Sequence, residues 1–147
     1  MPDALAPATF SSIMRPPVKL YEVLYMSSLA ADAPLSAVAD IAKQARPANQ
    51  RLGLTGLLLF DGARFCGQLE GGRQDVLATL DRIERDPRHG QFELLHYGPL
   101  EERRFSRFSM GYPQLDDDDV LERIEALYGH AAMAAFVGLI ETADLDS

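Results

Sequence analysis

Few residues of this 147-residue chain have the chemistry of an active or binding site. Tyr25 lies near the end of an alternating segment, and Asn49 follows shortly after Pro47. A buried tyrosine usually finds a partner for its hydroxyl, and an asparagine just after a proline is typical of a turn. Periodicity alone therefore favours a satisfied core tyrosine and a turn asparagine.

The other candidate groups predict no catalytic or metal centre. The three histidines are far apart in the sequence and match no metal-ligand spacing. Cys66 is the only cysteine, so an internal disulfide is excluded, and we interpret it as a small core side chain. Gly71 and Gly72 could bind an anion ahead of a helix, but such a pair is more often a simple turn.

Composition excludes several classes of partner. The net charge of -8 argues against a general nucleic-acid surface. No apolar run approaches the roughly 18 residues that span a membrane. The start, "MPDALAPATFSSIMRPP", lacks the pattern of a secretory signal and is expected to be a flexible leader at 1–17. With a single cysteine, a reducing cytoplasm is the expected compartment.

The elements that would position these residues follow the order β-α-β-β-α-β. Alternating or near-continuous apolar runs predict strands at 19–28, 54–60, 63–69, 92–98 and 103–112. Helical spacing predicts helices at 35–46, 73–85, 118–128 and 130–142. Pro47 should end the first helix, and the acidic run at 116–119 favours a solvated helix start over a metal site.

The expected fold is therefore α+β and ferredoxin-like, with an added fifth strand. Two helices should cover one face of the sheet, and two C-terminal helices the other. In the strand "RFCGQLEG", at 64–71, side chains alternate between the two faces. Phe65 and Gly67 should share one face, and Cys66 and Gln68 the other.

Together these segments resemble a BLUF domain, the blue-light sensor that uses FAD. The resemblance covers about 19–112, and the order and gaps of its motifs match as well as their letters. The motifs are "LYMSSLA" at 24–30, "NQRLGLTGLLLF" at 49–60, "RFCGQLEG" at 64–71, "RIERDPRH" at 82–89 and "RRFSRFSMGY" at 103–112. It implies a sensor domain at 18–113 and a helical extension at 114–147, similar to short stand-alone members.

The resemblance also implies roles for single residues. Tyr25 matches the tyrosine that donates an electron in light, and Asn49 the asparagine that hydrogen-bonds the flavin ring. Ile41 falls where a side chain of the first helix packs on that ring. The expected cofactor-binding residues are Tyr25, Ile41, Asn49, Phe65, Arg82, Arg88 and His89. The expected photoactive positions are Tyr25, Gly67, Gln68, Phe108 and Met110.

Two of these positions depart from the family pattern. Gly67 stands where the family has the glutamine that bridges tyrosine and flavin, and Phe108 stands in place of a tryptophan. A bulge at Gly67 could turn Gln68 inward, but the motif spacing leaves no extra residue for one. We therefore expect Gln68 to face away from the flavin and the photocycle to be impaired or atypical.

Three functions are open at this point. The first is a FAD-binding blue-light sensor, not an enzyme, with incomplete flavin occupancy. It would signal to an unidentified protein partner and form a homo-oligomer, with no nucleic-acid or membrane partner. The alternative is a divergent module that binds no flavin and acts through protein contacts. A third, an acylphosphatase-like hydrolase, rests on fold analogy alone, because we find no phosphate loop or nucleophile–base pair.

Overall fold

The computed structural model describes residues 19–112, 120–140 and 144–146. The strands are β1 (Leu20–Leu29), β2 (Thr55–Phe60), β3 (Arg64–Gly72), β4 (His89–Leu100), β5 (Phe108–Tyr112) and β6 (Asp144–Asp146). The helices are α2 (Ser36–Leu52), α3 (Arg73–Arg85), α4 (Val120–Glu125) and α5 (Gly129–Ile140). The expected leader and the acidic run at 116–119 lie outside the described residues.

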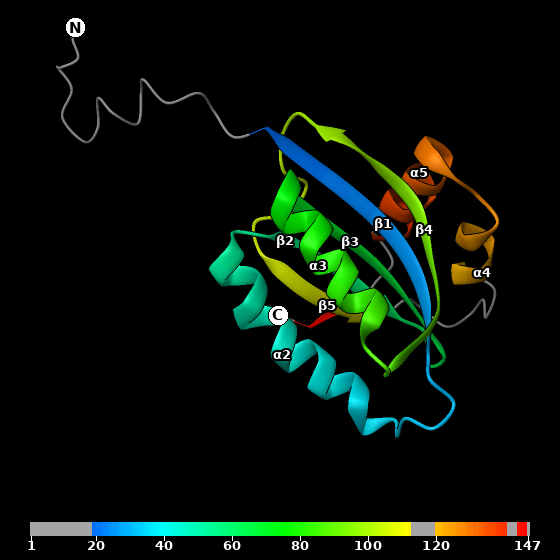
Figure 1. Cartoon of the computed structure of the whole chain (residues 1–147). Helices are drawn as coiled ribbons and strands as arrows, with labels where there is room; N and C mark the ends of the chain where they lie inside the picture. The colour runs from blue at the N-terminus through cyan, green and yellow to red at the C-terminus, as the bar shows by residue number, and fades with distance from the viewer. Residues whose placement is uncertain (1–18, 113–119, 141–143, 147) are drawn as a thin grey trace, which may run out of the picture.

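The six strands form one sheet in the order β4-β1-β3-β2-β5-β6 (Figure 1). β3 pairs antiparallel with both β1 and β2, and β4 pairs antiparallel with the other edge of β1. β5 extends the sheet as the parallel neighbour of β2. The ferredoxin-like plan with a fifth strand is therefore confirmed, while the three-residue β6 at the edge was not predicted.

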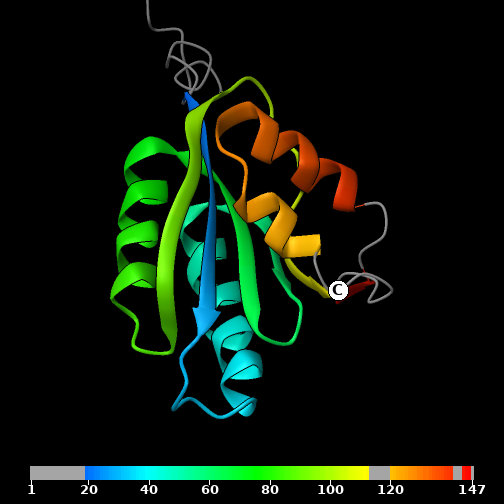
Figure 2. The same ribbon diagram turned by 90° about the vertical axis from the view of Figure 1, so that its right-hand side faces the viewer.

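Each face of the sheet carries its own core. Along β1, Val23 and Tyr25 pack under α2 and α3, whereas Leu24 and Met26 point to the opposite face. There α4 and α5 cover the sheet, with Phe136 fully buried. Figure 2 shows the two helix layers on either side of the strands, as predicted. In the described ranges, no helix is long and apolar enough to cross a bilayer.

Helix α2 continues past Pro47, so the prediction that this proline ends it was wrong. The helix ends at Gly53, whose left-handed φ of 70° provides the cap. Pro47 has no N–H, so the Lys43 carbonyl lacks its intrahelical partner. Ala42 and Asn49 are buried before and after the proline. The burial of these two side chains against the sheet outweighs the free-energy cost of the missing hydrogen bond at Pro47.

Two further boundaries differ from the prediction. β4 is longer than 92–98, and β5 begins at Phe108 rather than at residue 103. The loop before β5 is instead held at Arg104 and Phe105 by Glu70, whose side chain is fully buried. Its carboxylate accepts hydrogen bonds from the Thr55 hydroxyl, at 2.6 Å, and from the N–H groups of Arg104 and Phe105, at 3.0 and 2.9 Å. In this loop, hydrogen bonds to the Glu70 carboxylate thus take the place of the hydrogen bonds to a neighbouring strand.

A second buried carboxylate fixes the same loop. Glu22 accepts two hydrogen bonds from the Arg104 guanidinium, at 2.8 and 3.2 Å, and one from the Gln68 amide, at 3.2 Å. Burial raises the pKa of the Glu22 carboxyl, but the bonds from Arg104 and Gln68 outweigh it and hold the pKa below its usual value. The Gln68 amide also donates to Glu70, at 2.9 Å. We call Glu22, Gln68 and Glu70 the carboxylate cluster.

Pro47→Ala should raise the free energy of unfolding by about 1–3 kcal/mol, because it restores a hydrogen bond inside a helix. Urea unfolding followed by circular dichroism measures this change. The matched control is Pro34→Ala, ahead of the helix. Removing that proline should lower stability by about 0.4–1 kcal/mol, since it frees the unfolded chain. A Pro47→Ala protein no more stable than wild type would contradict the prediction.

Arg104→Gln should destabilise the fold by about 2 kcal/mol at pH 7, because it leaves the Glu22 carboxylate buried without its guanidinium. The figure is modest for a buried pair, since the Arg104 side chain is 34% exposed. The folded pKa of Glu22 lies below its ordinary value of 4.5, so this stability is present above that pH and is lost as pH falls through the folded value.

Unfolding curves from pH 7 down to pH 3 measure this dependence. The difference between wild type and Arg104→Gln should shrink in acid. The control is Arg85→Gln, which removes an exposed ion pair with Asp81 and should cost less than about 0.5 kcal/mol at every pH. A constant difference between wild type and Arg104→Gln would refute the assignment to Glu22.

Candidate functional site

A cleft opens between α2 and α3, over the sheet face that they cover. It contains about 640 Å³ of empty space, its open mouth included. Organic cofactors bind in clefts of this size that are mostly apolar with a few polar groups. Tyr25 and Leu69 reach it from the strands, Ile41 and Asn49 from α2, and Ile83 from α3.

The Tyr25 ring fills the space directly above Gly67. A Cβ atom added at Gly67 would lie only 2.4 Å from the Cε2 and Cζ atoms of that ring and 2.5 Å from its hydroxyl oxygen. The ring also stacks on Phe92, with 5.4 Å between centroids. Burial raises the pKa of Tyr25 well above its usual range, so the phenol stays protonated at neutral pH. Among the described residues, none is hydrogen-bonded to its hydroxyl.

Asn49 presents its side-chain amide to the same cleft. It is only 3% exposed, yet no other residue in the described part of the chain hydrogen-bonds this amide. The continuation of α2 past Pro47 puts it there, because Ile41, Ala45 and Asn49 follow one another at helical i, i+4 spacing. A nearly buried amide normally needs a partner, which a ligand with polar edge atoms would supply.

The predicted basic residues all line the cleft. They are Arg82, Arg88 and His89. Arg88 pairs with Asp86 at 2.6 Å and donates to Gln44 of α2 at 3.0 Å. The bonds from Arg88 hold the pKa of Asp86 below its usual value. His89 Nδ1 lies 2.8 Å from the Ser27 hydroxyl, and burial lowers the pKa of the imidazole. His89 is therefore neutral at pH 7.

Four predicted residues do not line the cleft: Phe65, Gly67, Gln68 and Met110. Phe65 is fully buried below it, with its ring against Phe60 at 4.8 Å and against His89 at 4.7 Å. Met110 is 1% exposed and belongs to the same core. Phe65 therefore supports the position of His89 rather than reaching the cleft itself. Phe108, in contrast, lies in the cleft wall.

Gln68 lies on the face opposite the cleft, as side-chain alternation predicts. It is fully buried in the carboxylate cluster. β3 keeps a continuous register with both β1 and β2 from Phe65 to Glu70, so there is no bulge at Gly67. The structure therefore places the glycine, not the glutamine, beneath Tyr25.

Sequence reasoning missed several lining residues. From α2 the cleft also receives Gln44, from α3 it receives Thr79, and directly after α3 it receives Asp86. Thr79, Arg82 and Ile83 recur at spacings of three and four, which puts them on one side of α3. That periodicity was a usable signal, because the cleft-facing side of α3 had already been marked by Arg82.

The chain was compared with known proteins. Residues 20–111 match the family model BLUF, described as sensors of blue-light using FAD. Over 110 residues the chain is 34% identical to the blue light- and temperature-regulated antirepressor BluF of Escherichia coli K12. Over 80 residues it is 30% identical to the photoactivated adenylate cyclase subunit alpha of Euglena gracilis. The alignments take up 71% and 54% of this chain, but only 27% and 8% of those two relatives.

Solved structures show the same fold. The dark-state structure of the BLUF protein BlrB has a TM-score of 0.60 and 32% identity, with 65% of this chain and 72% of that chain covered. The photo-activated state of BlsA has a TM-score of 0.68, with 84% of this chain and 94% of that chain covered. At 23% identity, the likeness to BlsA shows the fold alone. The family match, which spans both walls of the cleft, shows that the chain belongs to the BLUF family of blue-light sensors that use FAD.

Proposed function

We propose that this chain holds the flavin of FAD in the cleft between α2 and α3 and acts as a blue-light sensor. Two polar groups carry this proposal: the Asn49 amide and the Tyr25 hydroxyl both line the cleft, and neither is bonded to another described residue. Apolar side chains beside them, among them Ile41, Leu69 and Ile83, suit a planar ring. When bound, the flavin would supply absorption of blue light and the capacity to accept an electron.

Different residues of the cleft would bind different parts of the cofactor. Asn49 would hydrogen-bond the polar edge of the ring, and Ile41 would pack against its plane. The outer, phosphate-bearing part of FAD would lie near Arg82, Arg88 and His89. Because Arg88 is already tied to Asp86 and to α2, its guanidinium is held in place before the cofactor arrives.

The light switch of the family is altered at Gly67. In this proposal Tyr25 would give up an electron, but Gly67 beneath its ring has no amide to exchange hydrogen bonds. Gln68 could enter only by breaking its bonds to Glu22 and Glu70 and by turning to the other face of β3. We infer that light absorption here does not lead to the usual rearrangement of amide hydrogen bonds.

A second candidate function is a module that binds no flavin and acts through protein contacts. The position of the Tyr25 ring favours it, since the ring already fills the space above Gly67 and stacks on Phe92. This packing closes part of the floor on which a flavin would lie. Flavin titration decides between the two candidates.

Output in either case would pass through contacts rather than through catalysis by this chain. We propose a sensor unit at 18–113 and an extension at 114–147, acting in the cytoplasm on an unidentified protein partner, as a homo-oligomer. The antirepressor name of the Escherichia coli relative supports signalling to a protein. The packing of α4 and α5 on the sheet gives the extension direct contact with the sensor core.

FAD added to the purified protein should bind, and Asn49→Leu should weaken binding about 2- to 12-fold. This range corresponds to the loss of one hydrogen bond, about 0.5–1.5 kcal/mol. Quenching of flavin fluorescence measures the affinity. The control is Gln50→Leu, the exposed neighbour on α2, which should leave the affinity unchanged. Wild-type protein that causes no change in flavin fluorescence with tens of micromolar FAD would favour the second candidate.

Blue light should produce no lasting red shift of the flavin band in the wild type. Gly67→Gln returns the amide to the cleft face, although the Tyr25 ring must move to admit it. We therefore expect a reversible red shift in Gly67→Gln that disappears when Tyr25→Phe is added. Absorption spectra before and after illumination measure both. A wild-type red shift that Gln68→Leu abolishes would show that Gln68 has replaced the missing amide.

A further inference from the structure

A second pocket lies beside the flavin cleft and shares Phe108 with it. It contains about 940 Å³ of empty space, open mouth included, and is larger than the cleft. Three arginines line it, one from α2 and two from the loop that leads to β5: Arg46, Arg103 and Arg107. We call this the arginine pocket.

The charge of the arginine pocket is opposite to that of the whole chain. The chain carries a net charge of -8, yet no aspartate or glutamate side chain is among the described residues that line the pocket. Polar lining residues without charge are Gln50, Thr55 and Ser106. A concave surface with arginines from two elements and no carboxylate among its described lining residues favours a negatively charged ligand.

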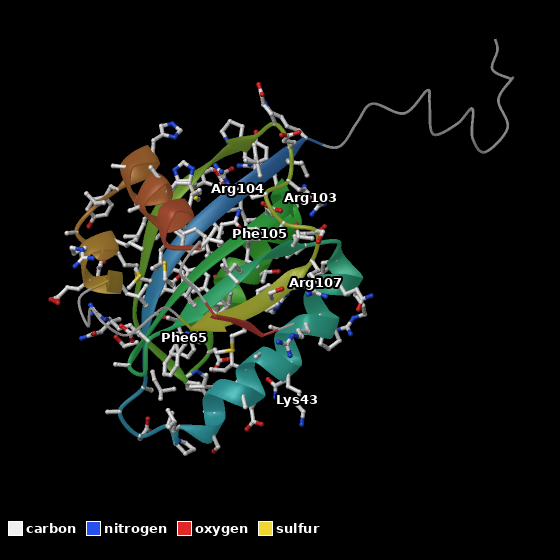
Figure 3. All side chains as sticks on the ribbon, turned by 180° about the vertical axis from the view of Figure 1, so that it is seen from behind. Lys43, Phe65, Arg103, Arg104, Phe105 and Arg107 are labelled. Carbon is white, nitrogen blue, oxygen red and sulfur yellow. The ribbon has the colours of Figure 1, made fainter. Side chains whose placement is uncertain are left out.

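The backbone of the loop and the Arg103 guanidinium are held in place before any ligand binds. The loop backbone is fixed by the Glu70 carboxylate at Arg104 and at the next residue. The Gly56 N–H donates to the Arg107 carbonyl at 3.2 Å. The Arg103 guanidinium donates to the Thr55 hydroxyl at 2.8 Å. Figure 3 shows both loop arginines beside β5 and the end of α2. Such fixed groups lower the entropy cost of binding.

We propose that the arginine pocket binds a small phosphate-bearing anion. Guanidinium groups match phosphate oxygens with two parallel hydrogen bonds, and the Ser106 hydroxyl and the Gln50 amide can donate to the remaining oxygens. Arg107 is exposed and makes no side-chain hydrogen bond to another described residue, so its donors are available. The site needs no flavin, so it stands or falls separately from the proposed sensor function.

Isothermal titration of the full-length, flavin-free chain with pyrophosphate at low ionic strength tests the proposal. Wild type should bind one pyrophosphate, and Arg107→Gln should weaken binding at least tenfold. Arg46→Gln is the second variant and should also weaken it. The matched control is Arg85→Gln, at the far end of α3, which should keep the wild-type affinity. Circular dichroism confirms that each variant is folded.

Three results would overturn the proposal. One is a wild-type chain that binds no pyrophosphate at millimolar concentration. Another is binding lost in Arg88→Gln but kept in Arg107→Gln, since that would place the anion in the flavin cleft. The third is acetate or glutarate binding as tightly as pyrophosphate, which would make the ligand a carboxylate.

Discussion

The pairing of β3 on both of its edges is the constraint on which the rest of this structure depends. Its register with β1 and β2 is continuous, so each side chain is committed to one face. Gly67 lies under Tyr25 on the face of the cleft, and Gln68 lies on the other face with Glu22 and Glu70. A bulge that exchanged them would break two ladders at once. As a result, Tyr25 packs against Gly67 on one face of β3, and the carboxylate cluster is buried on the other face.

The same strand links the two faces through the loop that follows β4. Glu70, on the far face, fixes the loop backbone, and the loop sets where β5 begins. β5 then carries Phe108 into the wall of the flavin cleft and of the arginine pocket. The Glu70 carboxylate, on the face that α4 and α5 cover, thus determines the position of Phe108, on the face that α2 and α3 cover. A substitution at Glu70 would therefore alter the walls of both pockets, although Glu70 is not among the residues that line either of them.

Local patterns in the sequence were sufficient for the order of elements and for the faces of β1 and β3, because alternation and helical spacing are local properties. They failed where distant contacts decide. Pro47 predicts a helix end, but the helix continues because Asn49 is buried against the sheet. The loop before β5 alternates like a strand, but Glu70 binds its N–H groups from 34 residues away. Periodicity alone also gave Asn49 as a turn residue; only the family resemblance placed it in the site.

Binding and switching place different demands on this site. Binding sums many contacts, so the lost amide costs about 0.5–1.5 kcal/mol against apolar burial worth roughly 25 cal/mol for each Å². Switching depends on one group that can exchange hydrogen-bond partners within reach of both Tyr25 and the cofactor. Gly67 has no side chain that could be that group, and it does not line the cleft. We therefore expect a BLUF chain with glycine at this place to lose its light response before it loses its flavin.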